Sequence, residues 1–94
     1  MARIREQIKT WTLNENKSND GADIGGYQSL MVSNYPESDF PVTVRFDGNF
    51  KHGLGPGEDF TEQVDGANIL VTIHPLHGEV KPGQKASGDI ILKG

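Results

Sequence analysis

The chain has 94 residues, an apolar fraction of 34% and a net charge of −4, which suits one small domain with a thin core. It contains no cysteine, so disulfide bridges, thiolate metal sites and cysteine nucleophiles are excluded. No apolar run approaches the roughly 18 residues of a membrane span, and the start MARIREQIK lacks the apolar centre of a signal peptide. We therefore expect a soluble protein made in the cytosol.

The charges are unevenly distributed along the chain. Residues 1–17 carry four basic and two acidic side chains, whereas residues 18–66 carry two basic and nine acidic ones. The acidic middle argues against a broad nucleic-acid surface, which needs clustered Lys and Arg to displace counterions. The basic start is suited instead to contact with an acidic neighbour.

The first predicted element is ambiguous. Ile4, Ile8 and Trp11 have the spacing of an apolar helix stripe, whereas the run TWTL at 10–13 favours a strand. We predict a strand over about 7–13, preceded by a short basic arm.

Apolar and polar residues alternate in five further segments. The clearest is 41–47, and 68–74 is the next, where Leu70 makes both faces apolar and predicts a central strand. The other predicted strands are 27–33, 59–64 and 86–92. The core shared by two packed sheets is predicted to contain Val42, Val44, Phe46, Ile69, Val71 and Ile73.

Tight-turn signals separate these segments. Asp-Gly pairs, which are typical of hairpin turns with positive φ, occur at 20–21, 47–48 and 65–66, and Pro-Gly pairs occur at 56–57 and 82–83. No convincing helix is present. The pattern predicts an all-β fold: a single small β-sandwich or jelly roll of about six to seven short antiparallel strands over residues 1–94.

The glycine-rich stretch GLGPGED at 53–59 superficially resembles a phosphate-binding loop. It lacks Lys, Ser and Thr at the positions that such a loop requires, and no helix follows it to supply free amide groups. We interpret it as the bend between two strands.

Two stretches resemble metal sites. IHPLHGEVKPG resembles the cupins, in which one residue separates two histidine ligands; here His74 and His77 are three apart, which sends them to opposite faces of a strand. A site of His74, His77, Glu79 and His52 is therefore a weak alternative to an exposed polar turn. NENKSNDGAD at 14–23 resembles a calcium loop but lacks its final glutamate, which leaves only a looser site with Asp20 and Asp23. We predict no metal and no cofactor.

No catalytic set emerges from the sequence. A carboxylate pair would have to come from Glu58, Asp59, Glu62 and Asp65, but a domain this small offers little cleft for a sugar chain. Ser29, Ser33 and Ser87 have no glycine-framed nucleophile turn around them. We expect a protein that is not an enzyme.

Apolar side chains in predicted turns often mark contact surfaces, although they can also plug the end of a sandwich. The predicted interface consists of these residues and the basic start: Arg3, Arg5, Lys9, Tyr35, Phe40, Phe50 and Leu54.

Residues 27–60 combine YQSLMVSN, FPVTVRFDG and LGPGE: a strand ending in Asn, a strand ending in Asp-Gly, and a Pro-Gly-Glu turn. This pattern resembles the small β-sandwich proteins of bacteriophage virions, such as receptor-binding, penton and cement modules. The resemblance implies a structural subunit of the virion that contacts further copies of itself or other virion proteins. We further expect residues 1–9 to contact a neighbour, with the acidic segment 58–65 as receptor.

The closing VKPGQKASGDIIL is typical of last strands in secreted bacterial β-sandwich modules. It leaves open the alternative of a carbohydrate- or calcium-binding module from a larger extracellular protein.

Overall fold

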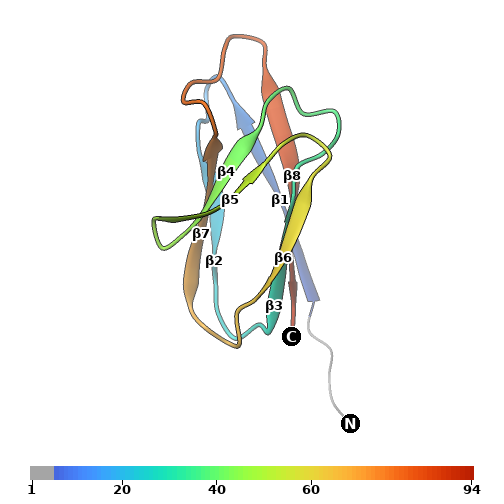
Figure 1. Ribbon diagram of the computed structural model, residues 1–94, viewed down its shortest axis with the longest axis vertical. Helices are drawn as coiled ribbons and strands as arrows, with labels where there is room; N and C mark the ends of the chain where they lie inside the picture. Colours follow the sequence, from blue (N-terminus) through green and yellow to red (C-terminus); the bar gives the residue numbers. More distant parts are fainter. Residues whose placement is uncertain (1–5) are drawn as a thin grey trace.

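The computed structural model describes residues 6–94, whose regular elements are eight β-strands (Figure 1). They are β1 (Glu6–Asn14), β2 (Asp20–Ile24), β3 (Ser29–Ser33), β4 (Val42–Phe46), β5 (Asn49–Leu54), β6 (Asp59–Gln63), β7 (Ile69–Pro75) and β8 (Lys85–Lys93). The predicted all-β fold is confirmed. The strand reading of 7–13 is also confirmed, because β1 covers it.

The strands form two antiparallel sheets that lie face to face (Figure 1). One, here called the β1 sheet, has the order β1-β8-β3-β6; the other, the β2 sheet, has the order β2-β7-β4-β5. Successive strands alternate between the sheets, except that β4 and β5 form a hairpin within one of them. An eight-stranded, double-sheet arrangement with this strand order is a jelly roll.

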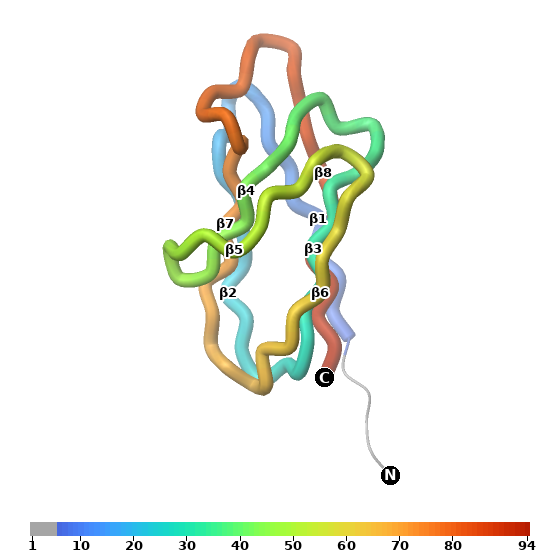
Figure 2. The backbone as a smooth tube through the Cα atoms, in the orientation of Figure 1, coloured from blue at the N-terminus to red at the C-terminus, as the bar shows by residue number. Residues whose placement is uncertain are grey.

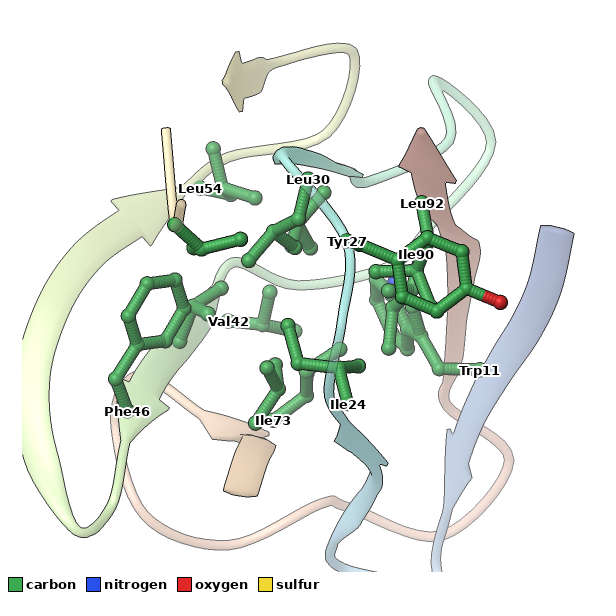
Figure 3. Packing of buried hydrophobic residues seen from close by; sticks show 14 of the residues in the cluster. Trp11, Ile24, Tyr27, Leu30, Val42, Phe46, Leu54, Ile73, Ile90 and Leu92 are labelled. Carbon is green, nitrogen blue, oxygen red and sulfur yellow. The ribbon is translucent and has the colours of Figure 1, made fainter. Parts of the chain in front are cut away.

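Strand alternation builds the core between the sheets (Figure 3). Five of the six predicted core residues are buried, and the sixth, Ile69, packs half-buried against them. The core prediction is therefore confirmed. Residues from the other strands complete it, including Trp11, Leu13, Leu30, Val32, Ile90 and Leu92.

Two strands escaped the sequence prediction. Asp20-Gly21 was expected to be a turn, but it begins β2, and the predicted strand count of six to seven is low. A Cβ on Gly21 would lie 2.0 Å from the Val71 carbonyl oxygen, so glycine serves close strand approach here rather than a turn. β5 was missed because four of its six residues are exposed and it pairs with β4 alone.

The other turn predictions are confirmed. Asp47 and Gly48 have φ values of 50° and 83°, as the turn of the β4–β5 hairpin requires. Asp65 and Gly66 have similar values of 49° and 80°, but this turn connects β6 to β7 in the other sheet and closes no hairpin. In the Pro-Gly pairs, Gly57 and Gly83 also have positive φ. The stretch 53–59 is the bend from β5 to β6, as predicted.

Asn34, which follows β3, holds three loops together from a buried position. Its side-chain amide donates to the carbonyl oxygens of Leu54, at 3.1 Å, and Phe40, at 3.3 Å. Its main-chain N–H donates to the carbonyl oxygen of Glu58 at 2.9 Å. The buried side chain thus fixes the end of β5 and the approach to β4, and the main chain of the same residue fixes the approach to β6.

The first strand begins one residue before the predicted start. Residues 6–9 belong to β1 and pair with β8, from Glu6 opposite Lys93 onward. They therefore take part in their own domain, contrary to expectation, whereas their contact with a neighbour stays a prediction and residues 1–5 lie outside the described residues. Within the described part of the chain, no helix has the length and hydropathy to cross a membrane.

Candidate contact surface between the two sheets

On one side of the sandwich, an edge strand of one sheet faces an edge strand of the other. β5 and β6 are the edge strands on this side, joined by the turn after Leu54 (Figure 2). A shallow groove of about 590 Å³ lies there. Its lining consists of Phe46, Asp47, Asn49, Phe50, Lys51, Glu62, Gln63, Val64 and Ile69. We call this groove, with these residues, the open side.

The rim of the open side carries an exposed aromatic ring. The tight turn at Asp47-Gly48 starts β5, and a register shift against β4 falls between Val44 and Arg45, as in a β-bulge. Phe50 lies within this irregular stretch, and 61% of its surface is exposed. Core residues line the same groove beside it: Phe46, which is only 5% exposed, and Val64.

Aromatic contacts join the two sheets at the open side. The rings of His52 on β5 and Phe60 on β6 are stacked, with centroids 4.8 Å apart and planes inclined by 6°. Phe60 also lies 6.4 Å from Phe46, ring to ring. These contacts hold the edges together without main-chain hydrogen bonds between β5 and β6.

An ion pair bridges the groove. Lys51 Nζ lies 3.4 Å from Glu62 Oε2 and 5.3 Å from the centroid of the Phe46 ring. Both ion-pair side chains are well exposed, so the pair contributes only about 0–1 kcal/mol. A competing ligand could therefore open it at little cost.

The opposite side of the sandwich, between β1 and β2, is tied more tightly. Asp20 accepts hydrogen bonds from the main-chain N–H groups of Thr12, at 2.9 Å, and Gly21, at 2.7 Å. Lys17 Nζ lies 3.3 Å from its carboxylate. Burial raises the pKa of Asp20, but these hydrogen bonds and the Lys17 charge outweigh it and leave the pKa below its ordinary value. With its oxygens so engaged, Asp20 is poorly suited to the calcium site considered above.

The predicted interface residues do not form one surface. Leu54 is fully buried, so the expectation that it lies exposed in a turn is wrong; its side chain completes the core where β5 ends. Phe40 is half-buried against that core. Phe50 alone among the predicted aromatic residues is largely exposed. Arg3 and Arg5 lie outside the described residues.

Two other predicted interface residues have partners in their own domain. Lys9 lies on β1 and reaches across to Asp20 and the Gly21 carbonyl of β2. The Tyr35 hydroxyl donates to Asp89 at 2.6 Å, and this hydrogen bond to a carboxylate raises the pKa of Tyr35. An interface role for either residue stays a prediction.

The acidic segment 58–65, predicted to receive a neighbour, contributes Glu62, Gln63 and Val64 to the groove, but no sequence pattern pointed to the groove as a whole. Lys51, Glu62, Gln63 and Ile69 come from separate strands and turns, and only the packing of two sheets brings them together. Among residues 6–94, no three His, Asp or Glu side chains gather closely enough to hold a metal ion.

The comparisons with known proteins leave the family open. No protein-family model matches the chain, and no curated protein matches it significantly.

Proposed function

We propose that the protein is a non-enzymatic structural subunit that assembles through protein–protein contacts, of the type found in bacteriophage virions. The observation that carries this proposal is the open side, where an exposed Phe50 adjoins the core residues Phe46 and Val64. Covering apolar surface yields about 25 cal/mol per Å². A partner seated in the groove would gain this free energy by covering Phe50 and the exposed edges of Phe46 and Val64.

Two further observations support the proposal. The jelly roll is an architecture of viral capsid domains, although lectins use it too, so the fold alone decides nothing. The pattern over residues 27–60 resembles small virion proteins in sequence, and Asn34, the last residue of its first motif, is the side chain that organises the surrounding loops.

Sedimentation velocity over a wide range of protein concentration tests the proposal. We expect the wild-type protein to sediment faster than a monomer as concentration rises. Phe50→Ser should shift it toward the monomer, whereas the control Leu76→Ser, which alters an exposed leucine outside the groove lining, should not. Monomeric sedimentation of all three proteins at every concentration would overturn it.

The groove also favours a second candidate function, carbohydrate binding. It combines the exposed ring of Phe50 with the polar side chains of Asp47, Asn49 and Gln63, and a few placed polar groups beside an apolar surface are typical of ligand sites. A glycan array decides this candidate. Saturable binding by a monomeric wild-type protein, lost in Phe50→Ser, would favour it over assembly.

A further inference from the structure

We propose that copies of the chain join head to tail, with the free edge of β1 in one copy pairing antiparallel with the free edge of β6 in the next. The β1 sheet would then continue from copy to copy. This inference rests on the proposed assembly function and names both its partner, a second copy, and its mode of contact.

The hydrogen bonds of β1 show which main-chain groups face its free edge. The Thr12 N–H donates to Asp20, on the side away from β8. Because main-chain groups alternate in direction along an antiparallel strand, the groups of Glu6, Ile8 and Thr10 also point away from β8. Asp20 covers this edge at Thr12, whereas Ile8 is 58% exposed.

The same reasoning applies to β6. The Val64 N–H donates to the Gln28 carbonyl, and the Glu58 carbonyl accepts from the Asn34 N–H, so even-numbered residues face the β3 side. The groups of Asp59, Thr61 and Gln63 therefore point to the free edge. All three residues are exposed. An edge of this kind is a ready template for another strand.

The side chains set the register. Ile8 lies opposite Ile91, Ile91 opposite Met31, and Met31 opposite Thr61, in one row across the β1 sheet. If Ile8 of the next copy lies opposite Thr61, this row continues on the same face. The edge groups of both residues then point toward each other, as a hydrogen-bonded antiparallel pair requires.

Charge favours head-to-tail over like-with-like pairing. Residues 1–9 carry three basic side chains, Arg3, Arg5 and Lys9, and one acidic side chain, Glu6, whereas β6 carries Asp59 and Glu62. Two β1 edges or two β6 edges would bring like charges together, and a mixed pair brings opposite ones together. In the proposed register, Glu62 is diagonal to Lys9 of the next copy, although Lys9 also contacts Asp20 and Glu62 also contacts Lys51 within their own copies.

The open side gives the added strand room. Glu62, Gln63 and Val64 line the groove along the free edge of β6. A strand added at this edge would therefore lie beside the groove on which the proposed function depends.

Disulfide trapping tests the pairing, because the chain contains no cysteine of its own. Ile8→Cys and Thr61→Cys are made as separate variants, with Leu76→Cys as a control for random collision. Within one copy, β8 and β3 separate Ile8 from Thr61, so about three strand spacings, roughly 14 Å, prevent an internal bridge.

We expect the oxidised mixture of Ile8→Cys and Thr61→Cys to form a disulfide-linked dimer well above the level of Leu76→Cys. The double variant should form a ladder of linked multimers. Dimerisation of Ile8→Cys alone to the same extent would overturn the proposal in favour of symmetric pairing, and so would a mixture no better than the control. If wild-type protein still self-associates in sedimentation, only the edge pairing fails; if it never does, the assembly function fails too.

Discussion

The Nζ atom of Lys9 lies 3.8 Å from Asp20 Oδ1 and donates a hydrogen bond to the Gly21 carbonyl. A side chain of the β1 sheet thus crosses to the edge of the β2 sheet and, with the Asp20 hydrogen bonds, closes one side of the sandwich. On the other side, β5 and β6 are joined by an exposed ion pair and by aromatic contacts instead of such hydrogen bonds. This asymmetry between the two sides underlies the proposals above.

Asp20→Asn should destabilise the protein by about 1–3 kcal/mol at neutral pH, because main-chain donors lose a charged acceptor. Since the folded-state pKa lies below the ordinary 3.8, this stabilisation is fully present above that pH and is lost as pH falls through the folded pKa. In urea unfolding, the free energy of unfolding should therefore fall less between pH 7 and about pH 3 in the variant than in the wild-type protein. Asp23→Asn, at an exposed position of β2, should behave like wild type.

Phe46→Ala should lower the free energy of unfolding by about 3–5 kcal/mol, because it leaves a cavity between the sheets. Phe50→Ala, at the exposed rim of the same groove, should change it by less than about 0.5 kcal/mol in the monomer. Urea melts at a concentration where the protein is monomeric provide the comparison. Similar losses in both variants would mean that the two rings are wrongly placed.

Asn34→Ala should lower the free energy of unfolding by about 1–3 kcal/mol, because the carbonyl oxygens of Leu54 and Phe40 lose their hydrogen-bond donor. Asn34→Asp should cost more at neutral pH, since a buried carboxylate would face those two carbonyls. Its folded pKa would be raised, so the variant should regain stability as acid protonates it. The destabilisation of Asn34→Asp relative to wild type should be smaller at pH 4 than at pH 7. An unchanged destabilisation would contradict the placement of this side chain against the two carbonyls.

Gly88→Ala should be strongly destabilising, by about 1–3 kcal/mol. An added Cβ would lie 1.8 Å from the Ser33 carbonyl oxygen and 2.8 Å from Trp11 Cε2, and that oxygen also accepts the Trp11 Nε1 hydrogen bond. Gly53→Ala is the matched control, because its Cβ would meet only Leu76, at 3.7 Å. Thermal melts should separate the two; equal melting temperatures would contradict the close approach at Gly88.

Local chemistry made much of the fold predictable. Alternation placed Val42, Val44 and Phe46 correctly, and Asp47-Gly48 and Asp65-Gly66 form the expected turns. The same Asp-Gly rule failed at Asp20-Gly21. Glycine is needed there because the Val71 carbonyl, which is distant in sequence, leaves no room for a side chain, and not because of a positive φ.

The candidate site was less predictable than the fold. Phe50 was identified as exposed, but Leu54, four residues later, was wrongly grouped with it because glycines flank both sides of Leu54 in the sequence. The groove depends on how the edges of two sheets face each other, which no short stretch encodes. Pairing across the sheets, such as His52 on Phe60, becomes visible only in three dimensions.

The strand order also determines when the chain can fold. β8 lies between β1 and β3, so the first strand has no main-chain partner within its sheet until the last strand has been synthesised. A nascent chain emerging from the ribosome must hold β1 unpaired until β8 has emerged. Contacts this distant in sequence slow folding, and we expect the sandwich to form in a late step that joins β1 to β8.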